Sequence, residues 1–89
     1  RIHAWDTLLQ ARAIENMAYC LGLNRVGEDP NGHHYPGHSA VYNPFGEVLC
    51  FSKKPGVLQV QLNLEYLQKQ RDKLPFLKDA DQFNIQYSL

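Results

Sequence analysis

Residues 5–26, WDTLLQARAIENMAYCLGLNRV, decide the fold of this chain, because they read as a helix that runs almost directly into a strand. Apolar side chains surround much of the first half, residues 5–16, which predicts the helix. Residues 18–23 are apolar at both alternating sets of positions, which is typical of a strand covered on both faces. The apolar run stops at Asn24 and Arg25, and polar groups at the end of a buried strand often line a site.

Polar residues of the helix admit two interpretations. Arg12 and Glu15 lie three positions apart and can meet on one helical face. They form either an ion pair that fixes the helix on its sheet or a support for a catalytic constellation. Asp6 either caps this helix or lies in its first turn.

The composition is typical of one small globular domain and gives no sign of a highly charged partner. The chain has 89 residues, with nine basic and nine acidic side chains that cancel. A domain of this length buries only about 60–65 % of its unfolded surface. The balanced charge indicates neither nucleic acid nor an anionic membrane as a partner. No apolar run approaches the roughly 20 residues that span a bilayer.

The two cysteines are too few for a disulfide scaffold. Cys20 and Cys50 each lie in an apolar segment that reads as a strand. We interpret them as buried thiols in a reducing compartment, so we expect a cytoplasmic protein.

Residues 27–38, GEDPNGHHYPGH, are predicted to form a loop, because Pro, Gly and an Asn-Gly step exclude a helix or a central strand. His33, His34 and His38 raise the alternative of a metal site in this loop. No carboxylate or cysteine stands at a recognised ligand spacing from them, so we expect hydrogen-bonded or solvated histidines and no metal.

The second half predicts a hairpin, a third strand and a second helix. Residues 39–43 and 47–52 read as strands joined by Asn-Pro-Phe-Gly, which suits a type I turn followed by a left-handed Gly. Lys-Lys-Pro-Gly then suits a type II turn before a strand at residues 57–62. Residues 64–74 should form a helix.

That second helix has a clear start and stop. Asn63 can cap its first turn and Pro75 ends it, while Leu64, Leu67 and Leu74 mark a buried stripe. Residues 76–89 carry much apolar surface on an irregular arm, which must dock on this domain or on a partner.

Several segments, in this order, resemble the carbon–nitrogen hydrolase (nitrilase) superfamily, and most closely its omega-amidase-like branch. They are ARAIEN with the following strand and NRVG, then NGHHYPGHSAVYNPFGEVL, then LQKQRDKLPFLKDADQF. The resemblance implies an α+β fold, the four-layer α-β-β-α sandwich, of which residues 1–89 would be a C-terminal fragment.

The resemblance also implies a chemistry that this chain does not carry itself. Enzymes of the family open a non-peptide C–N bond of a small amide through a Cys nucleophile, a Glu base and a Lys that stabilises the oxyanion, and they need no cofactor. These positions lie upstream of the segment that matches residues 5–16, so we expect no catalytic residue within residues 1–89. Neither Cys20 nor Cys50 is followed by a strand-to-helix elbow.

The resemblance implies a substrate and a partner, and the positions of three residues along the chain predict a pocket. The implied substrate is a small amide of dicarboxylate type, and the implied assembly is a homodimer in which the helix at residues 5–16 is a candidate contact. Asn24, Arg25 and His38 should lie near the substrate cavity, where Arg25 could hold a carboxylate. The competing interpretation pairs Arg25 with Asp29 or with a helix end.

Two functions of another class remain open at this point. The first is a non-enzymatic binding module. A genuine module should bury its own apolar surface, and residues 18–23 need covering on both faces. The second is a histidine-loop metal-binding protein.

Overall fold

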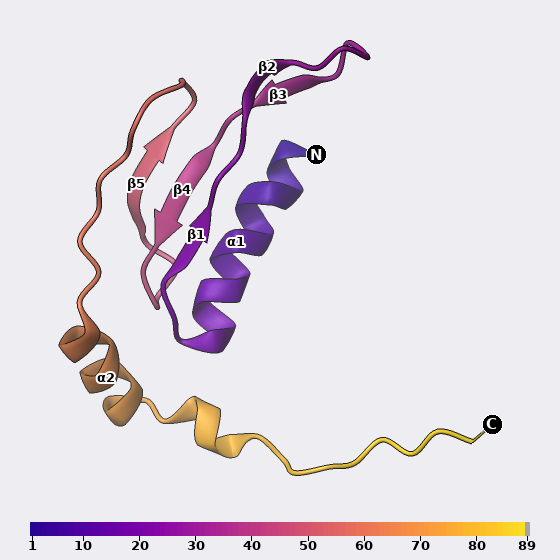
Figure 1. Cartoon of the computed structure of the whole chain (residues 1–89). Coiled ribbons are helices and arrows are strands. Elements are labelled where there is room, and N and C mark those ends of the chain that lie inside the picture. The colour runs from indigo at the N-terminus through magenta and orange to yellow at the C-terminus, as the bar shows by residue number, and fades with distance from the viewer. Residues whose placement is uncertain (89) are drawn as a thin grey trace.

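The computed structural model describes residues 1–88 as a mixed helical and stranded structure (Figure 1). A three-stranded antiparallel sheet has the order β1-β4-β5, and a separate two-stranded ribbon pairs β2 with β3. The elements are α1 (Ile2–Asn16), β1 (Cys20–Gly22), β2 (Val26–Glu28), β3 (His34–Pro36), β4 (Ser39–Tyr42), β5 (Val48–Ser52), α2 (Leu64–Lys73) and the 3-10 helix η1 (Phe76–Asp79).

The core lies where α1 packs on one face of the three-stranded sheet (Figure 1). Its centre is Ala13, which is fully buried, and it contacts Ala40 and Tyr42 of β4. Leu9 and Cys20 pack around these residues. A small residue at the contact lets the helix lie close to the strands, so the core is compact but small.

The end of α1 is set by a left-handed residue. Met17 has φ 46° and ψ 53°, and the backbone N–H of Ala18 donates to the carbonyl of Ala13 over 3.0 Å. This Schellman-type arrangement turns the chain sharply into β1. The helix ends at Asn16, as the sequence predicts, but it begins at Ile2 rather than at residue 5. Asp6 therefore lies inside the helix and is not its cap.

The strand after α1 is covered on one face only within residues 1–88. Gly22 is buried against α1, whereas Leu21 and Leu23 are 59 % and 90 % exposed. The doubly apolar pattern correctly indicates a strand, but the expected second cover is not supplied by this part of the chain. The arrangement leaves an apolar surface on the sheet face opposite α1.

The hairpin between β4 and β5 forms as its turn chemistry predicts. The N–H of Gly46 donates to the carbonyl of Asn43 over 2.9 Å, and Gly46 has φ 80°. The side chain of Asn43 accepts from the backbone N–H groups of Phe45 and Glu47. Asn43 thus accepts from three backbone N–H groups of the turn, one through its carbonyl and two through its side chain.

Three predicted features differ from the structure. The loop at residues 27–38 contains the ribbon of β2 and β3, in which Val26 pairs with Pro36. Residues 57–62 alternate like a strand but are extended without a partner among residues 1–88. Gly56 has φ 149°, far from the value of about 80° that a type II turn requires.

Helix α2 is capped as predicted but buries none of its residues. The Asn63 side chain accepts from the N–H of Tyr66 over 2.9 Å, and the helix ends at Lys73, two residues before Pro75. The predicted buried stripe is wrong for this structure, since Leu64 is 65 % exposed. Instead the helix is tied to the end of α1, because Arg71 Nε donates to the carbonyl of Met17 over 2.9 Å.

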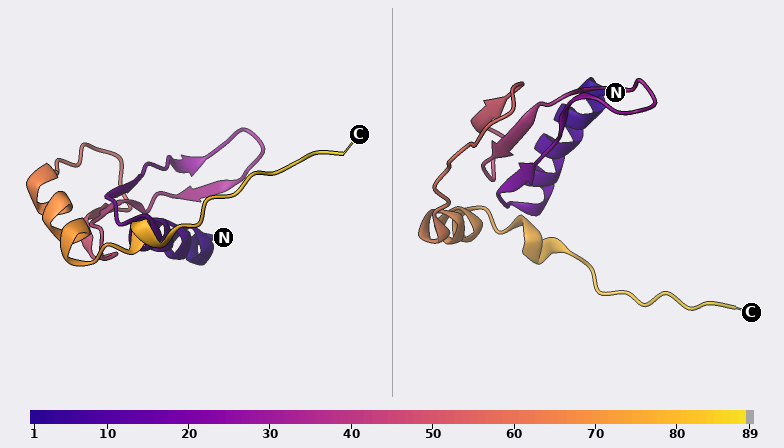
Figure 2. Two further views of the ribbon diagram at one scale, coloured as in Figure 1. Left: turned by 90° about the horizontal axis from the view of Figure 1, so that it is seen from below. Right: turned by 45° about the horizontal axis from the view of Figure 1, so that its top comes forward.

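The C-terminal arm extends away from the rest of the chain after η1 (Figures 1 and 2). Phe83, Ile85 and Tyr87 alternate along it, and all three are exposed. The Cα radius of gyration is 17.0 Å, whereas a self-packed chain of this length would have about 12 Å. No helix within residues 1–88 has the length and apolar character needed to cross a membrane.

We expect residues 1–89, made alone, to unfold without a sharp transition and to bind a dye for exposed apolar surface. The physical reason is the small core, whose buried apolar residues are Ala13, Met17, Ala40, Val41 and Tyr42. Thermal melting followed by circular dichroism, with dye fluorescence, measures both properties. A sharp cooperative melt from a monomer that binds no dye would contradict this expectation.

Candidate functional site

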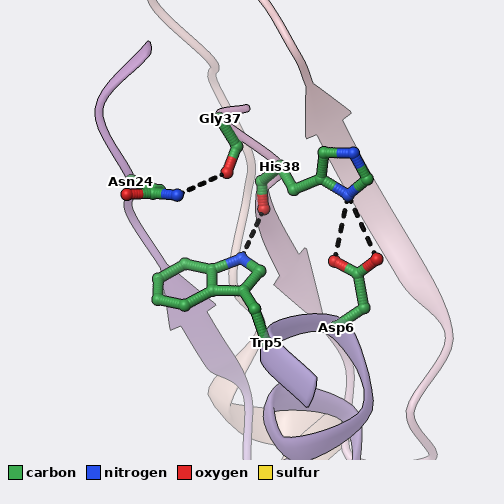
Figure 3. A network of polar contacts seen from close by, with 5 residues as sticks. All are labelled: Trp5, Asp6, Asn24, Gly37 and His38. Carbon is green, nitrogen blue, oxygen red and sulfur yellow. Dashed lines mark hydrogen bonds and ion pairs between the residues drawn. The ribbon is translucent and has the colours of Figure 1, made fainter. Parts of the chain in front are cut away.

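The candidate site lies where β1 ends and β4 begins, beside the first turns of α1 (Figure 3). Figure 3 shows Asn24 and Gly37 joined by one hydrogen bond, with Trp5 and Asp6 of α1 reaching His38 from below. The helix that packs on the sheet thus also brings two polar side chains to the sheet edge.

Asn24 is held by three hydrogen bonds to the segment that leads into β4. Its Nδ2 donates to the Gly37 carbonyl over 2.9 Å, and its backbone N–H donates to Ser39 Oγ over 2.9 Å. The Ser39 hydroxyl in turn donates to the Asn24 carbonyl over 3.1 Å. Gly37 and Ser39 therefore fix the orientation of Asn24, the second residue after β1.

His38 is held by α1 in a backbone conformation that non-glycine residues seldom adopt. Its φ is 61°, in the left-handed region. Trp5 Nε1 donates to its carbonyl over 2.9 Å, and its Nδ1 lies 3.1 Å from both carboxylate oxygens of Asp6. Its ring also packs edge-on against the ring of Phe51, with the two ring centres 4.8 Å apart. An ionised carboxylate only accepts, so this contact places a hydrogen on Nδ1.

Arg25 turns toward the β2–β3 ribbon. Its Nη2 donates to the carbonyl of Glu28 over 3.0 Å, and its guanidinium carbon lies 4.7 Å from the centre of the Tyr35 ring. This cation–π arrangement holds the charge next to the ribbon. One interpretation of the sequence paired Arg25 with Asp29, but within residues 1–88 the two form no ion pair. The positive charge of Arg25 nevertheless lowers the pKa of Asp29.

Asp29 organises the turn of the ribbon. Burial alone would raise its pKa, but hydrogen bonds from the His33 backbone, the Tyr35 hydroxyl and the Asn31 backbone outweigh that effect. Together with the charge of Arg25 they hold the pKa of Asp29 below its ordinary value. The turn is thus stabilised by an ionised carboxylate.

Two hollows meet at Asn24, which lines both of them. One, of about 910 Å³, lies between the start of α1 and the ribbon and includes Trp5, His34 and Tyr35 in its lining. The other, of about 380 Å³, lies against the apolar side of the sheet and is lined in part by Arg25. Arg1 lines the larger hollow, Arg25 and Lys54 line the smaller one, and among residues 1–88 no acidic side chain lines either.

The structure therefore brings together two of the three residues predicted to lie at a pocket. Asn24 and Arg25 line the smaller hollow, with Ser39, Ser52 and Lys54 as its other polar members. His38 lines neither hollow, and its ring instead contacts Asp6 and Phe51.

Trp5, Asp6 and Ser39 belong to the site but were not predicted from the sequence. The only signal was a lone Trp beside an Asp at the start of the predicted helix.

Other reactive side chains lie apart from this site. Cys20 packs with Tyr42 on the α1 side, and Cys50 pairs in register with Val41 on β4. Burial first, and then the charges of Asp6 and Cys20, raise the pKa of Tyr42 above its ordinary value. Both cysteines are free thiols. Within residues 1–88 no three His, Cys, Asp or Glu side chains are grouped to hold a metal ion.

Comparison with known proteins identifies the family. The model of the carbon–nitrogen hydrolase family matches residues 2–72. Omega-amidase YafV of Yersinia enterocolitica is 48 % identical over 86 residues, which are 93 % of this chain and 33 % of that protein. Omega-amidase YafV of Escherichia coli K12 is 45 % identical over 83 residues, 91 % of this chain and 32 % of that protein. The chain therefore belongs to the carbon–nitrogen hydrolase family.

Solved structures agree with the fold. XC1258 from Xanthomonas campestris, a CN-hydrolase superfamily protein, matches with a TM-score of 0.91 at 37 % identity and covers 97 % of this chain. This chain covers 33 % of XC1258, so it spans about a third of the relatives it matches. The α+β superfamily fold and the omega-amidase-like resemblance are thereby confirmed, and the coverage is that of a fragment.

The ribbon turn should loosen in acid. Because the folded-state pKa of Asp29 is lowered, its stabilising contribution is fully present above about 3.9, the ordinary Asp value, and is lost as the pH falls through the lower folded-state value. The backbone N–H resonances of Asn31 and His33, which donate to Asp29, should move together below that pH. Asp29→Asn is the matched control and should abolish the titration. Resonances that stay fixed down to pH 2 would contradict the assignment.

Proposed function

We propose that this chain is the C-terminal part of an amidase that hydrolyses a non-peptide C–N bond of a small, dicarboxylate-type amide to an acid and ammonia. The observation that carries this proposal is the identity of 48 % over 93 % of the chain with a protein named omega-amidase. A relative from Bacillus subtilis, 31 % identical over 80 residues, is named 2-oxoglutaramate amidase. Both names describe an amidase, and the second name specifies an amide that also carries a carboxylate.

The reaction would use residues outside this chain. A Glu accepts the thiol proton, and the Cys sulfur attacks the amide carbon while a Lys stabilises the oxyanion. The C–N bond then breaks, the nitrogen takes a proton and leaves as ammonia, and a thioester remains. Water opens the thioester, which yields the acid and restores the thiol. Neither Cys20 nor Cys50 has the place of this nucleophile, and no cofactor takes part.

Within this chain, Asn24, Arg25 and His38 are proposed to lie at or beside the substrate cavity. Asn24 and Arg25 support this by lining one hollow that has no acidic member among residues 1–88. Arg25 uses one N–H group on the Glu28 carbonyl, and its other donors make no hydrogen bond within residues 1–88. A guanidinium held at one side can still offer two parallel N–H groups to a carboxylate.

We also propose that the intact protein is a cytoplasmic homodimer and that α1 lies at the contact. On α1, Leu8 and Ile14 are 51 % and 52 % exposed within residues 1–88. Exposed apolar side chains on a helix favour packing against another element, such as a second helix.

The intact protein that carries this sequence should release ammonia from a monoamide of a dicarboxylic acid, whereas residues 1–89 alone should not. The reason is that the chain lacks the nucleophile, the base and the oxyanion donor. A coupled ammonia assay with succinamate and the ω-amide of 2-oxoglutarate measures both proteins. Activity of residues 1–89 that is lost in Cys20→Ala or Cys50→Ala would overturn the assignment, as would an intact protein inactive on all small amides.

Replacing Arg25 by Leu in the intact protein should raise KM for the dicarboxylate-type amide by roughly 10- to 100-fold, because a charged hydrogen bond to the substrate is lost. The melting temperature should change little, since Arg25 is exposed and its two internal contacts, to the Glu28 carbonyl and the Tyr35 ring, lie within the exposed ribbon. Lys69→Leu, on the exposed face of α2, is the matched control. A lower melting temperature with unchanged KM would leave Arg25 as a purely structural residue of the ribbon.

A further inference from the structure

Gly37 and His38 form a left-handed segment between the β2–β3 ribbon and β4, with φ angles of 77° and 61°. Gly adopts this conformation readily, but a residue with a Cβ atom is disfavoured there. A strained residue persists only where its surroundings fix it, and such residues cluster at functional sites. The question is what the strain at His38 achieves.

We propose that Asp6 and His38 are positioning residues whose contact fixes this segment and, through it, the orientation of the Asn24 carboxamide. The inference rests on the proposed function, in which Asn24 lies beside the substrate. It extends that function to two side chains that themselves stand outside both hollows.

The contacts run in one continuous chain from α1 to Asn24 (Figure 3). Asp6 holds the ring of His38, with its carboxylate oxygens 3.1 Å from Nδ1, and Trp5 holds the carbonyl of the same residue over 2.9 Å. The φ angle of His38 is the rotation about its N–Cα bond. It orients the Gly37–His38 peptide group, which is planar. The contacts to the side chain and carbonyl of His38 hold its Cα and N atoms in place, and the φ of 61° then sets the orientation of the Gly37 carbonyl.

That carbonyl is the acceptor for Asn24 Nδ2 over 2.9 Å. The Asn24 Oδ1 and the second N–H of its amide make no hydrogen bond within residues 1–88. Figure 3 shows Oδ1 on the side of the carboxamide that points away from Gly37. The held carboxamide thus offers a free acceptor, which suits an amide N–H of the substrate.

The surroundings of the imidazole favour positioning over proton transfer by His38 itself. Its ring meets Phe51 edge-on at 4.8 Å and contacts Asp6 through Nδ1. It lines neither hollow, whereas Asn24 lines both. A side chain that acts on the substrate would need access to one of them.

Four variants of the intact protein test the proposal. Asp6→Ala and His38→Ala each remove the contact, and His38→Ala also leaves a strained left-handed Ala. His38→Asn keeps it, because Asn tolerates the left-handed region and its Nδ2 can donate to Asp6. Asp72→Ala, on the exposed face of α2, is the control for loss of one carboxylate.

We expect kcat/KM to fall by roughly 10- to 100-fold in Asp6→Ala and His38→Ala, since a displaced positioning group costs that much. His38→Asn should stay within about threefold of wild type, and Asp72→Ala should be unchanged. The indole N–H resonance of Trp5, assigned with Trp5→Phe, and the Asn24 side-chain amide resonances should shift in the two damaging variants only.

Other results overturn either the proposal or the function on which it rests. If His38→Asn is as slow as His38→Ala while the Asn24 resonances stay in place, the imidazole acts chemically and does not position. If kcat/KM is unchanged although the resonances shift, Asn24 needs no such support. If the intact wild type hydrolyses no amide, the proposed function fails first. The coupled shifts then still decide whether Asp6 and His38 fix Asn24.

Discussion

The close approach of α1 to the sheet is the constraint on which the rest of the structure depends. It requires small residues at the points of contact. A Cβ atom at Gly22 would collide with the side chain of Leu9, and one at Gly46 would lie 2.7 Å from Ile14 Cδ1. Ala13 and Ala40 complete the contact. Larger residues at these places would push the helix outward and withdraw its first turns from the edge of the sheet.

Two left-handed residues other than Gly mark the ends of this unit, and each is stabilised from a distant part of the chain. Met17 ends α1, and its carbonyl accepts from Arg71 of α2 over 2.9 Å. His38 precedes β4, and its carbonyl accepts from Trp5 of α1, also over 2.9 Å. Each conformation costs of order 1–3 kcal/mol, and a hydrogen bond from a side chain of α1 or α2 helps to offset it. The sharp turns that bring α1, β1 and β4 together are thus maintained by tertiary contacts.

Local chemistry was enough to predict some elements, because their determinants lie next to each other in the sequence. The Asn43 turn and the Asn63 cap are examples, since each depends on one side chain and the nearest backbone groups. The β2–β3 ribbon was missed, because Gly and Pro argue against a central strand but are tolerated in a short two-stranded ribbon. The apolar alternation of residues 57–62 predicted a strand, yet a strand also needs a neighbour, and residues 1–88 provide none.

The candidate site shows the same division between local and distant information. Asn24 could be predicted because it follows an apolar run, which is a local pattern. The partners that orient it could not be, since Trp5 and Asp6 stand 33 and 32 positions from His38 and meet it only when α1 packs on the sheet.

The side of the sheet that carries α1 holds this polar network, while the opposite side is apolar and open at Leu21 and Leu23. In a family with a layered fold, an open apolar side is where the next layer packs. Asn24 lines the hollow beside the start of α1 and also the hollow on the apolar side, so it stands at the edge between the two sides.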